Sequence, residues 1–306
     1  MKRNALILHS TVTKWSTLVM DVALARSLGF EGMELSAAKL RNYLDAGYSQ
    51  SELTGLLAGV DIPAMGFILD LERQGDGFAD LQGEAEEQFR LAHMAGARAV
   101  QIITGPVDVR AVVAFHAKKT YPGYRGLLGL PIDDQVALTA ANLALLADMA
   151  ANYGLLVYLE ALAWTPLNSL DLQLRIIERA NRANIRIVVD FWHCYASGDG
   201  PERVAKVPRE LIFGVHVCDS LPFSGGIPDE GVLRDVSTGS GVLDLQDWVD
   251  AVKATGYDGW WSGELFCKRD QQGHSPTVAA DLKALVAALV LGDGAVPRPR
   301  EKASRI

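Results

Sequence analysis

Four acidic or imidazole side chains each end a short apolar run in the second half of the chain. The runs end at Glu160, Asp190, His216 and Glu264. Hydrophobic runs of this length are typical of buried parallel strands. One charged residue at a strand end is usually a helix cap or a loop ion pair. Four oxygen or imidazole donors in succession instead indicate a rim of strand ends around one divalent cation.

The donor set also indicates a type of chemistry. Three carboxylates and a neutral imidazole suit Mn²⁺, with Mg²⁺, Co²⁺ and Zn²⁺ as alternatives, and they leave the loaded site with a formal charge near −1. Such a cation could polarise a substrate carbonyl and stabilise the enediolate that forms when a neighbouring C–H proton leaves. We therefore expect Glu160 and Glu264 to be catalytic, moving this proton as well as binding the metal.

Strand-like and helix-like patterns alternate along the whole chain. The expected strands are 5–9, 31–36, 62–69, 98–104, 155–160, 185–190, 212–218 and 259–265. The expected helices are 17–28, 49–58, 80–95, 133–153, 169–183, 201–207, 243–255 and 276–291. Eight such units predict an α/β fold, a single-domain (β/α)8 TIM barrel, because each parallel strand needs a crossover helix. The alternative, an open doubly wound sheet, usually has a glycine-rich turn after its first strand, and residues 9–13 contain none.

The barrel is expected to occupy residues 1–292, followed by a mobile tail over 293–306 that contains Gly, Pro, Arg and Lys. Two connections are long, 105–132 after the fourth strand and 219–242 after the seventh. Both would lie at the C-terminal face of the barrel, where barrel enzymes build their sites. We expect 105–132 to be a lid or a wall facing the substrate.

Composition restricts the environment and the partners. The chain has 306 residues, 49% of them hydrophobic, and a formal charge of −8, which opposes general binding to nucleic acid. No apolar run approaches the roughly 18 residues of a membrane span, and the apolar stretch after Met1 is too short for a secretory signal. Three scattered cysteines predict no disulfide framework, so we expect a cytoplasmic protein. The sequence leaves a homo-oligomer open.

Several motifs resemble one known family. They are Leu159-Glu160, Thr165-Pro166-Leu167-Asn168-Ser169, Val189-Asp190-Phe191-Trp192-His193, His216-Val217-Cys218-Asp219, Gly239-Ser240-Gly241 and Gly263-Glu264-Leu265-Phe266, with Met33-Glu34-Leu35 upstream. In this order they resemble the xylose-isomerase-like TIM-barrel superfamily of sugar isomerases and epimerases, and within it the inosose isomerases. The resemblance covers most of the chain.

The resemblance implies roles for individual residues. It implies that Glu160, Asp190, His216 and Glu264 bind the metal, that His193 contacts the substrate, and that Arg234 holds substrate oxygens through its guanidinium fork. A structural loop histidine and a solvent-exposed loop arginine are the alternatives for the last two. Further candidates for lining the substrate site are His9, Glu34, Trp15 and Trp164. The two tryptophans either pack in the barrel rim or stack on a sugar ring.

The chain departs from the family pattern around this expected pocket. Ser36 and Cys267 stand where relatives often have arginine, no proline precedes Gly239, and the 105–132 connection is long. The substrate therefore stays open within one class, a small ketose, keto-polyol or inosose for a metal-dependent isomerase or epimerase. A lyase or dehydratase acting on inosose, dehydroshikimate or a glycoside would begin with the same proton removal. An abasic-site endonuclease and a non-enzymatic binding protein are weaker alternatives.

Overall fold

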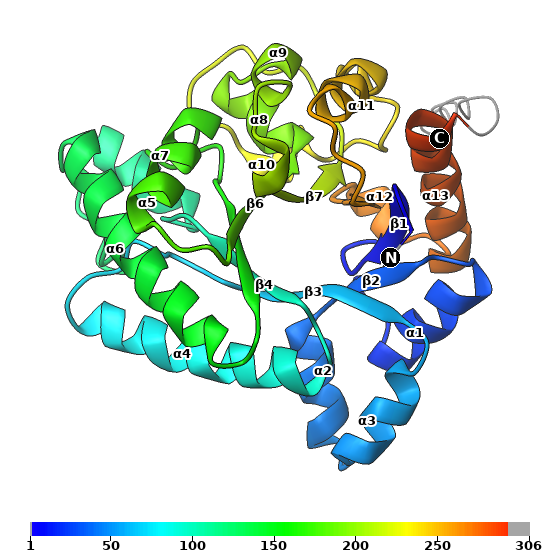
Figure 1. Cartoon of the computed structure of the whole chain (residues 1–306). Coiled ribbons are helices and arrows are strands. Elements are labelled where there is room, and N and C mark those ends of the chain that lie inside the picture. The colour runs from blue at the N-terminus through cyan, green and yellow to red at the C-terminus, as the bar shows by residue number, and fades with distance from the viewer. Residues whose placement is uncertain (1, 293–306) are drawn as a thin grey trace.

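The computed structural model describes residues 2–292, so the predicted tail over 293–306 lies outside the described residues. Eight parallel strands close into a barrel in chain order, and helices surround them (Figure 1). The strands are β1 (Ala5–His9), β2 (Gly32–Leu35), β3 (Asp61–Ile68), β4 (Ala99–Ile103), β5 (Leu156–Glu160), β6 (Ile185–Asp190), β7 (Ile212–Val217) and β8 (Trp260–Gly263). The predicted single-domain TIM barrel is confirmed.

The helices include several that the sequence patterns did not predict. Within residues 2–292 they are α1 (Leu18–Ser27), α2 (Ala37–Asp45), α3 (Gln50–Leu57), α4 (Asp76–Met94), α5 (Val109–His116), α6 (Ile132–Ala151), α7 (Leu170–Ala180), α8 (Phe191–Ser197), α9 (Pro201–Val204), the 3-10 helix η1 (Arg209–Leu211), α10 (Glu230–Leu233), α11 (Leu245–Ala254), α12 (Lys268–Gln271) and α13 (Ser275–Leu291). Among residues 2–292, no helix has the length and apolar character needed to cross a membrane.

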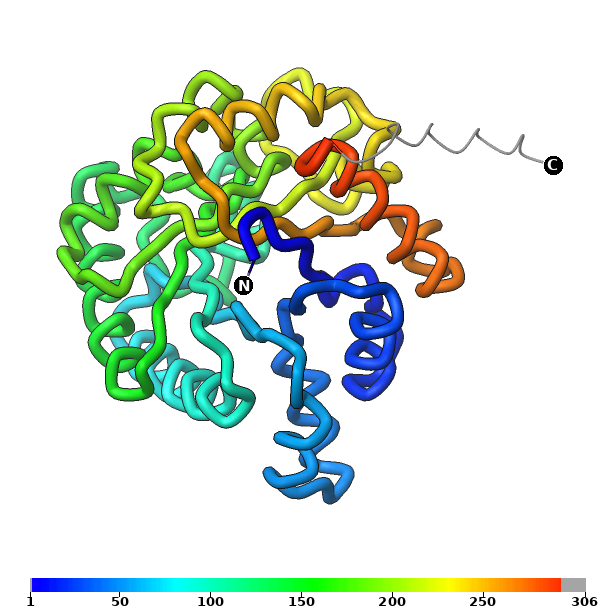
Figure 2. The backbone as a smooth tube through the Cα atoms, turned by 45° about the vertical axis from the view of Figure 1, so that its right-hand side comes forward, coloured from blue at the N-terminus to red at the C-terminus, as the bar shows by residue number. Residues whose placement is uncertain are grey.

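Three of the additional helices lie in segments expected to be loops. Ser36, Asp108 and Asp190 cap α2, α5 and α8, because each side chain accepts a hydrogen bond from a backbone N–H in the first helical turn. The connection over 105–132 is therefore partly helical. The helix predicted over 201–207 is shorter and ends at Val204. Figure 2 shows α2 and α3 extending outward from the barrel.

Strand periodicity decides which side chains face the barrel interior. A small apolar cluster, separate from the main core between strands and helices, includes Ala5 and Ile7 of β1, Tyr158 of β5 and Trp260 of β8. Successive side chains of a strand point to opposite faces, so the next inward residue of β1 after Ile7 is His9. In this way apolar residues fill the lower part of the barrel, and polar inward residues follow them at the C-terminal ends of the strands.

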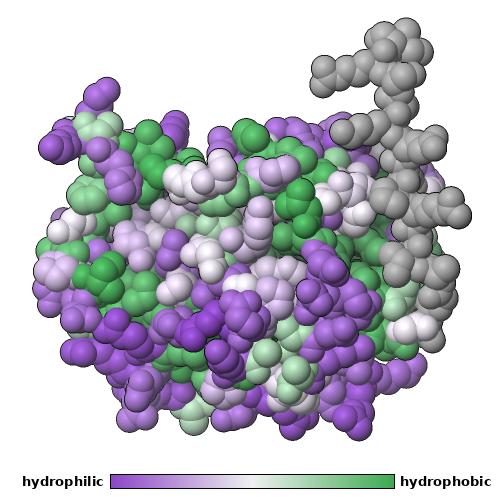
Figure 3. Space-filling view, turned by 90° about the horizontal axis from the view of Figure 1, so that it is seen from above, coloured by the Kyte–Doolittle hydropathy of each residue, from purple (hydrophilic) through white to green (hydrophobic). Residues whose placement is uncertain are grey.

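One close approach fixes the interior packing. A Cβ on Gly214 of β7 would lie 1.9–2.3 Å from the indole ring of Trp260 on the adjacent β8. Glycine therefore leaves the space that this buried ring occupies. Seen from above, the visible molecular surface mixes polar and apolar residues in small groups (Figure 3).

Candidate metal centre and active site

The four predicted ligands converge at the C-terminal ends of β5 to β8. His216 Nδ1 lies 3.4 Å from Glu160 Oε1, 3.8 Å from Asp190 Oδ2 and 3.8 Å from Glu264 Oε2. Asp190 and His216 are register partners on β6 and β7, and Glu264 directly follows β8. Barrel closure thus brings ligand atoms of Glu160, Asp190 and His216 within 4.8 Å of one another, and Glu264 borders this group.

Two buried atoms of the donor set lack hydrogen-bond partners, which indicates a place for a cation. Glu160 Oε1 and His216 Nδ1 are both buried, and neither has a hydrogen-bond partner among the described residues. Leaving buried polar atoms unpaired costs free energy, so native proteins normally satisfy them. A divalent cation between these atoms would satisfy both, with Asp190 and Glu264 completing a set of carboxylate and imidazole donors.

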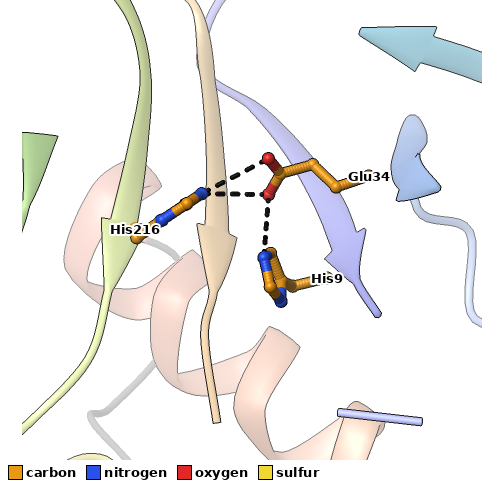
Figure 4. A group of neighbouring side chains, drawn as sticks. All are labelled: His9, Glu34 and His216. Carbon is orange, nitrogen blue, oxygen red and sulfur yellow. Dashed lines mark hydrogen bonds and ion pairs between the residues drawn. The ribbon is translucent and has the colours of Figure 1, made fainter. Parts of the chain in front are cut away.

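Glu34 of β2 orients the imidazole of His216. Its carboxylate oxygens lie 3.1 and 3.3 Å from His216 Nε2, and the Nε2 of His9 is 3.5 Å from Glu34 Oε2 (Figure 4). Tyr158 and Ser262 also donate hydroxyl hydrogen bonds to this carboxylate, at 3.1 and 3.0 Å. A carboxylate behind a ligating histidine fixes the ring and its tautomer. Glu34 lines the cavity as predicted, but its contacts make it the partner of His216.

Arg234 is buried among the carboxylates. Its Nη2 lies 2.5 Å from Glu264 Oε2 and 3.5 Å from Asp190 Oδ2, and its Nη1 lies 3.1 Å from Glu230 Oε1. The guanidinium also lies over the rings of Trp192 and Phe266, at 5.2 and 4.1 Å from their centroids. Because it is only 2% exposed, the alternative of a solvent-exposed loop charge is wrong. Arg234 both lines the cavity and offsets the negative charge of the donor set.

Burial and neighbouring charges shift the pKa values of these groups in opposite directions. Burial, opposed by Arg234 and reinforced by Glu264, raises the pKa of Asp190 to about 8. Burial also raises the pKa of Glu160. For Glu264 burial acts in the same direction, but Arg234 and His216 hold its pKa well below the ordinary value. For His216 burial disfavours the charged form, yet Glu34 and Glu264 raise its pKa well above 6.5. Such divergent values are typical of functional sites.

A cavity of about 260 Å³ lies above these donors, and its lining includes Glu160, Glu264 and His193. The Nδ1 of His193 accepts a hydrogen bond from the backbone N–H of Ala163 at 3.1 Å. Burial, together with Arg234, lowers the pKa of His193 well below 6.5. The neutral ring therefore carries its proton on Nε2. It lies at the start of α8 and not in a loop, and it presents one hydrogen-bond donor.

Of the other residues predicted to line the substrate site, three do so and one does not. His9, Glu34 and Trp164 line the cavity, and Trp164 is held by a 2.8 Å hydrogen bond from its Nε1 to the carbonyl of Pro106. Trp15 is 67% exposed and lies outside this lining, so the structure does not bring it to the site. Phe67, 56% exposed, lines the cavity mouth and was not predicted from the sequence.

Two further cavity residues could have been found from strand periodicity. Gln101 of β4 donates a hydrogen bond from Nε2 to Glu160 Oε2 at 3.0 Å, and Tyr158 of β5 donates to Glu34. Each lies two residues from an inward position, Ala99 and Glu160 respectively, so both point inward. Gln101 leaves Glu160 Oε1 as the free oxygen of that carboxylate.

Asp219 links the His216-x-x-Asp219 motif to the Gly239-Ser240-Gly241 turn. Its carboxylate accepts backbone N–H hydrogen bonds from Gly239, Gly241 and Leu243 at 2.8–3.1 Å. A Cβ on Gly241 would lie 2.2 Å from Asp219 Oδ1, so glycine permits this approach. The spacing His216-x-x-Asp219 thus ties the donor on β7 to the conformation of the following loop.

The connection over 105–132 contributes to the site at its beginning. Val107 lines the cavity, and the Pro106 carbonyl holds Trp164. The segment is anchored to the loop after β3, where the Tyr124 hydroxyl donates a 2.8 Å hydrogen bond to Glu72 Oε1. Burial raises the pKa of Glu72 to about 7. This segment therefore forms part of the cavity wall, and its role in turnover stays a prediction.

Comparisons with known proteins give the same family as the motifs. Residues 22–288 match the family model described as xylose isomerase-like TIM barrel. The chain is 32% identical over 131 residues to a 3-dehydroshikimate dehydratase of Pseudomonas aeruginosa, covering 42% of this chain and 21% of that protein. It is 31% identical over 124 residues to an inosose isomerase of Bacillus subtilis, covering 40% and 44%. The chain thus spans less than half the length of these two relatives.

Longer matches extend over nearly the whole barrel. An inosose isomerase of Bacillus velezensis is 24% identical over 266 residues, covering 84% of this chain and 86% of that protein. Among solved structures, the IolI protein with a bound zinc atom has a TM-score of 0.81 at 20% identity and covers 94% of this chain and 98% of its own. With a family match over most of its length, the chain belongs to the xylose isomerase-like TIM barrel family.

Proposed function

We propose that the protein is a divalent-metal-dependent isomerase or epimerase of a small ketose, keto-polyol or inosose, acting through an enediolate. The observation that carries the proposal is the facing pair of buried atoms, Glu160 Oε1 and His216 Nδ1, which lie 3.4 Å apart and make no hydrogen bond, below a cavity of about 260 Å³. Two relatives of this chain are named "inosose isomerase" and "putative hydroxypyruvate isomerase", and one solved structure with a similar fold is named L-ribulose 3-epimerase. These names fit the proposed reaction class.

Glu160, Asp190, His216 and Glu264 would hold the cation. When bound, it would supply Lewis-acid polarisation of a substrate carbonyl. Mn²⁺ suits this oxygen-rich donor set, and Zn²⁺ is supported by the zinc-binding IolI relative. His216 would bind through Nδ1, because Glu34 occupies its Nε2 side.

The chain's own groups would move the proton and orient the substrate. Glu160 and Glu264 both line the cavity and come from opposite ends of the β5–β8 arc, so one could remove a C–H proton and the other return it. Gln101 fixes the Glu160 carboxylate through its 3.0 Å hydrogen bond. The Nε2–H of His193 would donate a hydrogen bond to a substrate oxygen, which orients the reacting carbon.

The experiment incubates ketoses, keto-polyols and inososes in D₂O with the Mn²⁺- or Zn²⁺-loaded protein. The metal is then removed from the reaction mixture, and proton NMR spectra of the sugars are recorded. The proposal expects deuterium to replace the α-proton of one class, and expects loss of that exchange in His216→Ala. His274→Ala is the matched control, because His274 is exposed and lies at the start of α13. If no member of the panel exchanges its α-proton, or if His216→Ala exchanges as fast as the wild type, the proposal fails.

A lyase is the second candidate, favoured by the 32% identity to a 3-dehydroshikimate dehydratase. The same carboxylates could remove the α-proton. In a lyase a β-hydroxyl would then leave, whereas in an isomerase a proton would return to the substrate. The NMR screen separates the two reactions. An isomerase or epimerase gives a deuterated product with all its hydroxyl groups, whereas a dehydratase gives an unsaturated product that has lost one.

A further inference from the structure

A second hollow of about 460 Å³ lies beside the catalytic cavity. We call it the outer cavity, and its lining includes Val112, Phe115, Leu130, Trp164, Pro166 and Ile227. Trp164 lines both cavities, so its indole stands at the boundary between them. The proposed reaction uses only the catalytic cavity, which leaves the outer one without a role.

The outer cavity has an unusually apolar rim. Phe115, Leu130 and Ile132 line it and are 45%, 43% and 39% exposed. Burying the exposed part of each of these apolar side chains under a ligand would be favourable. A group of such side chains around a concavity is typical of a ligand-binding surface.

Most of the polar side chains in the lining are already engaged with the protein. Gln135 donates from Nε2 to the carbonyl of Leu130 at 2.8 Å, and Asn168 donates from Nδ2 to the carbonyl of Ala163 at 2.8 Å. The Thr165 hydroxyl donates to the carbonyl of Leu162 at 2.9 Å. These hydrogen bonds hold the loops in place, so the surface left for a ligand is mainly apolar, with the His116 imidazole as one polar group.

The segment between β4 and α6 connects the two cavities physically. Val107, near its start, lines the catalytic cavity, whereas Val112 and Phe115 of α5 and Leu130 line the outer one. The Pro106 carbonyl fixes the Trp164 indole between them with a 2.8 Å hydrogen bond. Because the Trp164 indole lines both cavities, one molecule could have a polar end in the catalytic cavity and an apolar end on the far side of this ring.

We infer that the outer cavity is a subsite for an apolar group, such as an aryl aglycone, attached to the sugar whose polar ring occupies the catalytic cavity. This inference rests on the proposed function and specifies its substrate class as a sugar that carries both an apolar substituent and a free ketone, because enediolate formation needs a carbonyl next to a C–H. The glucosides used below lack that ketone and therefore report binding alone. The catalytic cavity, at about 260 Å³, is slightly smaller than the roughly 300–1,000 Å³ usual for small-molecule sites, which fits a single sugar ring.

The test compares the dissociation constants of phenyl β-D-glucoside and methyl β-D-glucoside on the zinc-loaded protein by NMR titration. Burial of the phenyl ring should make the phenyl glucoside bind about tenfold more tightly or better. Leu130→Asp places a charge on the apolar rim, and it should bring this ratio close to one while leaving the methyl glucoside unaffected. Val113→Asp is the matched control, since Val113 is 50% exposed on α5, the helix that supplies Val112 and Phe115 to the outer cavity, but does not itself line that cavity.

Several results would overturn the inference. They are equal binding of the two glucosides by the wild type, no detectable binding of the phenyl glucoside, and an unchanged ratio in Leu130→Asp. A change from dimer to monomer in Leu130→Asp, measured by light scattering, would assign the rim to a second copy of the chain and overturn it too. The binding ratio needs no turnover, so it can fail while α-proton exchange succeeds, and the two proposals are tested separately.

Discussion

Replacing Glu34 by glutamine should weaken metal binding although Glu34 is not a proposed ligand. The Glu34 carboxylate faces His216 Nε2 at 3.1 Å and also accepts hydrogen bonds from Tyr158 and Ser262. A carboxylate accepts through both oxygens, whereas the amide nitrogen of glutamine only donates. In Glu34→Gln the glutamine NH₂ group would therefore face groups that also donate, among them His216 Nε2–H. The His216 ring would then lose the orientation that points Nδ1 at the carboxylates.

The size of the effect follows from the position of Glu34 behind the proposed ligand. Loss of a carboxylate partner of a metal-binding histidine typically costs about 10–100-fold in metal affinity, or about 1.4–2.7 kcal/mol. The wild-type carboxylate is buried at 6% exposure, so solvent would not replace the lost hydrogen bonds. We expect the dissociation constant for Zn²⁺ to rise within this range while the protein remains folded.

The assay is a competition titration of Zn²⁺ between the protein and a chelating dye, with folding checked by thermal unfolding of the metal-free protein. Glu72→Gln is the matched control, because Glu72 is equally buried but bonds to Tyr124, away from the donor set. An unchanged zinc affinity in Glu34→Gln would refute the reasoning. An equal loss in Glu72→Gln would show that the effect comes from general destabilisation.

Four more predictions follow from the site. His216→Ala should lose stoichiometric metal after loading, measured by elemental analysis, and full occupancy would contradict its assignment as a ligand. Glu160→Gln and Glu264→Gln should keep some metal but slow α-proton exchange in D₂O by about 10²–10⁴-fold, and wild-type exchange at full metal occupancy would exclude that glutamate as a base. Replacing 105–132 with a short linker should leave cooperative unfolding but strongly reduce turnover, whereas unchanged kinetics would exclude a role as lid or wall. The pKa of Glu72 is about 7 in the folded protein against 4.5 ordinarily, so the folded state holds the extra proton, and the stability this group contributes is lost as the pH rises from about 4.5 through 7. Glu72→Gln should therefore gain about 3 kcal/mol of unfolding free energy relative to wild type between pH 4.5 and 8, measured in urea, and a constant difference would contradict the shift.

The local sequence pattern was sufficient for the barrel and for the convergence of four donors. Short apolar runs alternate with helical stretches, and parallel strands in such an order can close into a barrel. Because strand ends in a barrel meet at one rim, the donors at or next to the C-terminal ends of β5, β6, β7 and β8 had to lie near one another. This inference needs only the direction and order of the strands, which the chain carries locally.

The helices α2, α5 and α8 were missed for a local reason. Each begins at a side-chain cap, Ser36, Asp108 or Asp190, that is short and common in loops as well. Asp190 was interpreted as a metal ligand alone, yet its Oδ1 also accepts the backbone N–H of His193 at 2.7 Å. One side chain thus starts a helix and points at the proposed metal position, which its spacing in the sequence does not show.

How the donors are used could not be predicted from local sequence patterns. Glu34 and His216 are 182 residues apart, and their pairing exists because closure of the barrel between β1 and β8 brings β2 near β7. The same closure buries Arg234 against Glu264 and leaves Trp15 outside the cavity. Strand order and periodicity indicated the four donors at the rim but missed Gln101 and Phe67. Side-chain partners, burial and the outer cavity depend on contacts between distant segments, and these form only when the chain is folded.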